Sequence, residues 1–117
     1  MIAIDTNVLV RYLVNDDKRQ ADVAKDLIDG VAGSGGQVFL STIVLVETVW
    51  VLESSYDFKK QEILSVLQDL LASGIFFCER QECVVSAIDR FCRGKADFSD
   101  YLSASISLNV VGSKLHT

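Results

Sequence analysis

The chain has 117 residues, of which half are apolar and 23% are charged, and it contains no proline. This composition excludes a disordered, collagen-like or low-complexity chain, and the length predicts one domain, residues 1–117, with a core of its own. Sixteen acidic and eleven basic side chains give a net charge of −5. That charge argues against a protein that coats duplex nucleic acid by neutralising phosphates, but it is compatible with a nuclease whose acidic site binds metal ions.

The first third of the chain predicts a strand, two helices and a loop. Residues 1–5 have the pattern of a short buried strand that stops at an acid. Residues 6–14 carry apolar side chains at helical spacing, and the aspartates at 16–17 favour the start of a second helix, which Gly30 would end. The glycine-rich residues 30–36 predict a loop. The apolar face of the second helix is expected to consist of Ala21, Ala24 and Ile28.

The middle of the chain predicts a strand at residues 38–40, followed by a segment that supports two interpretations. The many valines of residues 41–52 favour a strand. The length of the segment, and a start at Ser41 or Thr42, favour a buried helix. We predict the helix, in which Glu47 is the only charge within an otherwise apolar run.

The remainder of the chain alternates further helices with a third strand. We expect an amphipathic helix at 59–72, a strand at 75–78, a helix around 84–91 that Gly94 closes, and a last helix at 99–108. Strands that alternate with helices imply an α/β fold with a parallel central sheet and helices on both faces. Such sheets bind ligands beyond the carboxyl ends of their strands, which is where Asp5 and Ser41 are expected.

Cysteine usage and hydropathy predict a cytoplasmic protein. The three cysteines form no CxxC pair, and one histidine is too few for the common zinc sites, so we expect buried, reduced thiols at Cys78, Cys83 and Cys92. No segment has the apolar length of a membrane helix, and the N-terminus MIAID lacks the basic region of a signal peptide.

The aromatic side chains in apolar runs are expected to belong to the core. Trp50, Phe76 and Phe77 all stand in such runs, and large apolar side chains are more often buried than exposed for stacking on bases.

Three acids occupy positions that are costly for a carboxylate. Asp5 ends the first strand, Glu47 lies in the valine-rich helix, and Asp100 opens the last helix. An unpaired buried charge is strongly disfavoured, and three acids in one apolar neighbourhood repel one another unless a cation lies between them. Mg²⁺ and Mn²⁺ prefer such oxygen ligands. Taken singly, each acid could instead cap a helix, stabilise its first turn or point to solvent.

Three segments together resemble a PIN-domain protein, and more narrowly a VapC-type ribonuclease toxin of prokaryotic toxin–antitoxin pairs. They are MIAIDTNVLVRYL, FLSTIVLVETVWVLE and KADFSDYLSASI, in this order along the chain. The resemblance implies that Asp5, Glu47 and Asp100 are catalytic, metal-binding acids. It implies that Asp97 is either a further acid of the site or a helix cap. The supporting residues that it implies are Thr6, Asn7 and Ser41.

The same resemblance implies a function. It is the divalent-metal-dependent hydrolysis of RNA phosphodiester bonds by the toxin of a type II toxin–antitoxin pair, with Mg²⁺ or Mn²⁺ activating a water molecule. A cognate antitoxin and a homodimer are implied as partners, and the helix at 59–72 is one candidate for the dimer surface. Arg11, Arg93 and Lys95 are candidates to contact RNA phosphates, although each could also be an ordinary surface charge.

The sequence departs from the family pattern near its end. The chain stops at GSKLHT, where the resemblance implies a final strand, a fourth acid and a closing helix, so we expect the last strand and the closing helix to be truncated. Residues 114–117 look like the start of that strand. The alternative function is therefore a PIN domain with impaired or no nuclease activity that binds an antitoxin or itself.

Overall fold

The computed structural model describes residues 1–14 and 17–115. The chain divides into two compact units, Met1–Glu79 and Arg80–Thr117. The first unit contains β1 (Ile2–Ala3), α1 (Thr6–Leu13), α2 (Lys18–Gly33), β2 (Val38–Leu40), α3 (Thr42–Ser55), α4 (Lys60–Ala72) and β3 (Phe76–Cys78). The second contains α5 (Gln81–Arg93) and α6 (Phe98–Leu115). Among the described residues, three strands and six helices confirm the predicted α/β class.

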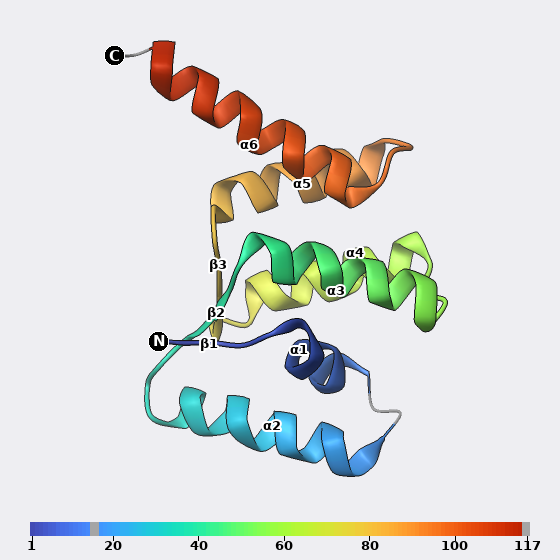
Figure 1. Ribbon diagram of the computed structural model, residues 1–117, viewed down its shortest axis with the longest axis vertical. Coiled ribbons are helices and arrows are strands. Elements are labelled where there is room, and N and C mark those ends of the chain that lie inside the picture. The colour runs from blue at the N-terminus through green and yellow to red at the C-terminus, as the bar shows by residue number, and fades with distance from the viewer. Residues whose placement is uncertain (15–16, 116–117) are drawn as a thin grey trace. The chain divides into compact units, whose positions relative to one another are not determined.

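The strands of the first unit form a parallel sheet in the order β1-β2-β3 (Figure 1). Val38 pairs with Ile2 on one side and with Phe76 on the other. Because the strands are parallel, their carboxyl ends lie at the same edge of the sheet. The helices α1 and α3 begin at that edge, within three residues of the ends of β1 and β2.

The first strand is shorter and more exposed than predicted. Only Ile2–Ala3 is a strand, and both residues are exposed, whereas Ile4 is buried. In the described sheet β1 pairs with β2 alone, so one side of this edge strand has no neighbouring strand to cover it.

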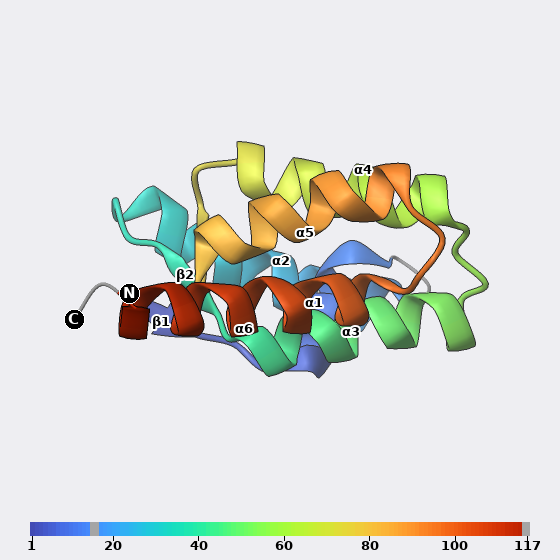
Figure 2. The same cartoon turned by 90° about the horizontal axis from the view of Figure 1, so that it is seen from above.

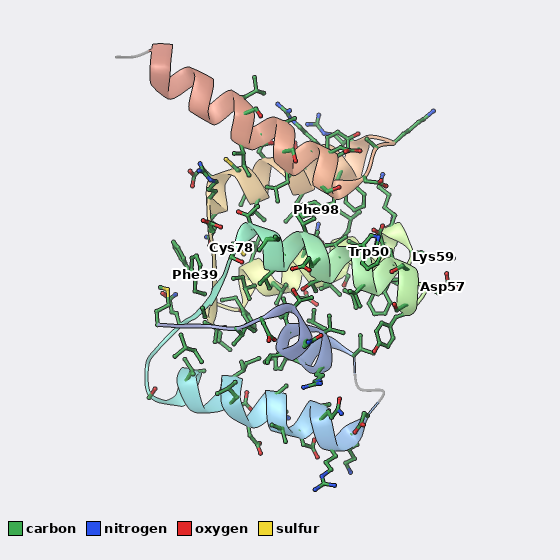
Figure 3. All side chains as sticks on the ribbon, in the orientation of Figure 1. Phe39, Trp50, Asp57, Lys59, Cys78 and Phe98 are labelled. Carbon is green, nitrogen blue, oxygen red and sulfur yellow. The ribbon has the colours of Figure 1, made fainter. Side chains whose placement is uncertain are left out.

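The two faces of the sheet differ in burial. Val38, Leu40 and Cys78 are buried on one face. On the other face the rings of Phe39 and Phe77 stack at a centroid distance of 6.4 Å, and Phe77 is 41% exposed. In Figure 3, Phe39 projects away from α3. The prediction that Phe77 belongs to the core was therefore wrong.

The valine-rich segment is a helix, as predicted. The hydroxyl of Ser41 accepts a hydrogen bond from the Val44 N–H at 3.3 Å and so caps α3. Leu45, Val49 and Leu52 are buried at helical spacing, so packing overrides the strand propensity of the valines. Trp50, labelled in Figure 3, lies outside this buried face. It is 66% exposed, which corrects its predicted place in the core.

The second helix extends further than predicted. Asp17 caps α2, since its carboxylate accepts a hydrogen bond from the Gln20 N–H at 3.2 Å, while residue 16 lies outside the described residues. The helix continues through Gly30 to Gly33. It ends where Gly35 takes a φ of 79°, a left-handed conformation that glycine adopts without steric cost.

The second unit is a helical hairpin, because the chain reverses between α5 and α6 (Figure 2). The apolar face of α5, which includes Val84, Ala87 and Ile88, is buried. The rings of Phe91 and Phe98 meet edge to face at 6.0 Å. Cys83 is buried as expected, but Cys92 is exposed because it lies outside that apolar face.

The last helix is longer than predicted. Lys114 and Leu115 belong to α6 rather than to the start of a strand, and residues 116–117 lie outside the described part of the chain. Among the described residues, no helix combines the length and apolar character that a membrane span requires.

Candidate active site

Asp5 links the first strand to the first helix. It follows β1 closely and has extended backbone angles, and its Oδ1 accepts a hydrogen bond from the Val8 N–H at 2.9 Å. Asp5 is therefore the N-cap of α1, which is one of the non-catalytic roles that the sequence left open for this acid. Its Oδ2 forms no hydrogen bond with any described residue. The carboxylate is thus held in one orientation and keeps one oxygen for a ligand.

Thr6 and Glu47 meet although they are 41 residues apart. The Thr6 hydroxyl donates a hydrogen bond to Glu47 Oε1 at 3.3 Å. This contact joins the first residue of α1 to the middle of α3. Glu47 is exposed rather than buried, since it lies on the outer face of α3 with Trp50. The carboxylate is therefore accessible to a ligand and is oriented by one neighbour.

A further acid stands at the same edge of the sheet and was missed by the sequence analysis. Glu79 directly follows β3, and its Oε1 accepts a hydrogen bond from the Thr42 N–H at 2.8 Å. The Glu79 N–H in turn donates to the Leu40 carbonyl at 2.8 Å. Glu79 and Ser41 together satisfy two N–H groups of the first turn of α3. An acid immediately after a predicted strand was the available signal, as for Asp5.

Asp97 and Asp100 lie in the second unit, at the start of α6. Asp100 is in the first turn, and its N–H donates to the Asp97 carbonyl at 3.1 Å. Both residues are exposed. Their carboxylates therefore lie near the positive end of the helix dipole, where negative charge is stabilised.

The candidate acids are divided between the two units. Asp5 and Glu47 belong to the first, and Asp97 and Asp100 belong to the second. Neither unit by itself has, among its described residues, three or more His, Cys, Asp or Glu side chains grouped to hold a metal ion. The carboxylate oxygens are nevertheless the donor type that hard divalent cations prefer.

Residues 2–110 match the PIN domain. The chain belongs to the PIN domain family. The matched region contains all the candidate site residues, from Asp5 to Asp100, and includes parts of both units. It confirms the resemblance on which the sequence analysis relied.

A relative of known type gives a second comparison for this PIN domain. The chain is 24% identical over 104 residues to a VapC ribonuclease of Aquifex aeolicus (strain VF5). The aligned part covers 89% of this chain and 76% of that protein. Together the two similarities support a nuclease of the PIN family.

Proposed function

We propose that this PIN domain, as a single domain of residues 1–117, is a divalent-metal-dependent endoribonuclease and the toxin of a type II toxin–antitoxin pair. The observation that carries the proposal is the hydrogen bond between Thr6 and Glu47. It ties the helix that Asp5 caps to the helix that bears Glu47. Two oriented carboxylates therefore belong to the same edge of the first unit, within a chain similar to a VapC ribonuclease.

The donor set of the chain fits Mg²⁺ or Mn²⁺. Asp5, Glu47 and Asp100 would hold the metal, with Asp97 as a further acid or as a helix cap. A bound divalent ion lowers the pKa of its water and stabilises charge on the phosphoryl oxygens. The protein contributes orientation: the Val8 N–H fixes the Asp5 carboxylate, and the Thr6 hydroxyl fixes that of Glu47.

The supporting residues have separate roles in this proposal. Thr6 orients Glu47, and Ser41 anchors the first turn of α3, three residues before Val44. Asn7 is exposed next to Thr6, where its amide can contact substrate. Each role requires a polar side chain at that position.

The proposed binding partners are inferred from the similarity to the VapC ribonuclease. An RNA substrate and a cognate antitoxin in the cytoplasm are proposed because the chain is similar to a VapC ribonuclease. A homodimer is proposed with them. The arginine side chains expected to contact phosphate are exposed, as substrate contact requires.

Cleavage of a labelled single-stranded RNA in Mn²⁺, together with Mn²⁺ binding by calorimetry, tests the proposal. Asp5→Asn and Glu47→Gln each remove one negative ligand and are expected to lower the cleavage rate by at least about 100-fold. Asn retains N-capping ability, so Asp5→Asn should remain folded. Asp26→Asn is the matched control, because Asp26 is an exposed acid on α2 and does not belong to the candidate set.

Two results would contradict the proposed nuclease. One is a cleavage rate that is the same in Asp5→Asn, Glu47→Gln and the wild type, because the activity would then come from a contaminant. The other is a folded wild-type protein that neither binds Mn²⁺ nor cleaves RNA. That second result would favour a PIN domain that binds an antitoxin or itself.

A further inference from the structure

A polar cavity of about 370 Å³ lies between α1, α2 and α3 of the first unit. On α1 it is lined by Asn7, which directly follows Thr6. On α3 it is lined by Val51, which lies one helical turn after Glu47. Because Thr6 and Glu47 are joined by a hydrogen bond, the cavity begins within one turn of this pair on both helices.

Arg11 gives the cavity a positive charge one turn after Asn7 on α1. In the described part of the chain, no carboxylate forms an ion pair with Arg11. The acid that lines the cavity is Asp17, whose Oδ1 accepts a hydrogen bond from the Gln20 N–H as the cap of α2. The N-terminus of α2 offsets part of the Asp17 charge. The guanidinium is thus available for an anionic ligand.

The other lining groups suit the remainder of a nucleotide. Six of the eight lining side chains are polar. The amides of Asn7 and Gln20 can each donate and accept hydrogen bonds, and Tyr56 contributes an aromatic side chain at the end of α3. Single-stranded RNA is recognised through such hydrogen bonds to base edges and sugar hydroxyls, and through contacts with aromatic rings. The volume is within the usual range of about 300–1,000 Å³ for sites that bind small molecules.

A neighbouring groove provides a contrast. It also borders Arg11, but it is lined mainly by apolar side chains, among them Val8, Val23 and Leu27. Val23 is 68% exposed and Leu27 is 45% exposed. An apolar lining favours a protein segment, whereas the polar lining of the cavity beside Glu47 favours a nucleotide.

We propose that the polar cavity binds one nucleotide of a single-stranded RNA, adjacent to the bond that is cut. Its phosphate lies on the Arg11 guanidinium, which can form two parallel hydrogen bonds to phosphate oxygens. Its base and sugar lie among Asn7, Gln20 and Tyr56. This inference rests on the proposed nuclease function and assigns to Arg11 the role of a substrate-binding residue.

RNA affinity measured without metal tests the cavity separately from the metal site. Fluorescence anisotropy of a labelled RNA hexanucleotide with the full chain in EDTA reports binding, because cleavage needs the metal. Arg11→Ala is expected to weaken binding about tenfold, as loss of a charge-assisted hydrogen bond does. The slope of log K against log salt should also fall by about 0.7, the value for one phosphate contact on a single strand. Arg19→Ala removes the same charge and is the matched control, since Arg19 lines the apolar groove and not the polar cavity.

A titration of the wild-type protein with AMP gives a readout that needs no variant. The side-chain amide signals of Asn7 and Gln20 in a ¹⁵N-correlated NMR spectrum are expected to shift with increasing AMP. The signals of other asparagine and glutamine side chains, such as Gln68 on α4, should not move.

The outcomes separate the cavity from the proposed function. Equal weakening by Arg11→Ala and Arg19→Ala would show a general charge effect and overturn the cavity proposal. Unchanged affinity in Arg11→Ala would also overturn it, as would Asn7 and Gln20 signals that do not respond to AMP. Either result would favour a protein segment as the ligand of the cavity. In all these cases Asp5→Asn could still abolish cleavage, so the nuclease proposal would stand.

Discussion

Residues at the carboxyl ends of the strands accept hydrogen bonds from the first turns of helices in this protein. Ser41 follows β2 and caps α3, and Glu79 follows β3 and accepts a hydrogen bond from the same helix. Asp5, after β1, caps α1. An acid at such a position can cap a helix and hold a ligand with its second oxygen. The choice between a cap and a catalytic acid at Asp5 is therefore not exclusive.

The Cys78 thiol should make stability depend on pH in the alkaline range. Burial raises the pKa of Cys78 above its ordinary value of 9.0. Above about pH 9 the unfolded chain loses this proton while the folded protein keeps it, so the free energy of unfolding falls as pH rises through this range. The fall attributable to Cys78 is at most about 1.4 kcal/mol for each pH unit until the folded thiol also ionises.

Urea unfolding of Cys78→Val between about pH 8 and pH 10 measures this contribution. The variant should lose less stability with rising pH than the wild type, because valine does not titrate. Cys92→Ser changes an exposed cysteine and should retain the wild-type pH dependence. Parallel curves for Cys78→Val and the wild type would contradict the role of Cys78.

At the scale of elements, two glycines predict opposite effects of the same substitution. A Cβ at Gly94 would overlap the Tyr101 hydroxyl, where α5 turns into α6, so Gly94→Ala should destabilise the protein by about 1–3 kcal/mol. A Cβ at Gly30, inside α2, meets nothing within 4 Å. Gly30→Ala should therefore stabilise the protein by about 0.4–1 kcal/mol.

Thermal unfolding of both variants tests these two predictions. The melting temperature should fall for Gly94→Ala and rise for Gly30→Ala. The Tyr101 hydroxyl also accepts a hydrogen bond from the Ala96 N–H at 3.2 Å, so it has little freedom to move aside. A Gly94→Ala variant as stable as the wild type would be incompatible with the close approach of Tyr101.

The elements were predictable where capping and burial agreed. Residues 41–52 were correctly predicted as a helix from Ser41 and from the length of the run, because the cap and the buried face both form. Gly30 was wrongly predicted to end α2, because an exposed glycine can remain helical at modest cost. The burial of Trp50 was wrongly predicted because composition alone does not show which face of α3 meets the core.

At the scale of the whole molecule, the apolar stripe of α4 is not expected to form part of a dimer contact. Ile63, Leu64, Leu67 and Leu70 are all at most 4% exposed, so the core already uses this stripe. Sedimentation velocity is expected to give a dimer of the 12.9 kDa chain. Gln68→Arg, on the exposed side of α4, should leave the dimer intact. A monomer at high protein concentration would contradict the homodimer, and dissociation by Gln68→Arg would show that the exposed side of α4 lies in the dimer contact.

The candidate site was predictable in part, because its residues follow strand ends and helix starts that the sequence marks. Asp5, Thr6 and Ser41 lie where the alternation of strands and helices placed them. Glu79 directly follows a predicted strand, and this signal was overlooked; its contact with Thr42, 37 residues away, could be seen only in the structure. The assembly of Asp100 with Asp5 and Glu47 stays a prediction, since the sequence places these acids on separate elements.

The contact between Thr6 and Glu47 also has a consequence for the newly made protein. It closes a segment of 41 residues and accompanies the parallel pairing of β1 with β2. Parallel strands cannot pair through a tight turn, so this contact has to wait until α2 and β2 have been synthesised and α3 has formed. A ribosome-bound fragment that ends before residue 47 therefore contains Asp5 but no oriented pair of acids. Under the proposed function, such a fragment would lack the pair of acids that cleaves RNA.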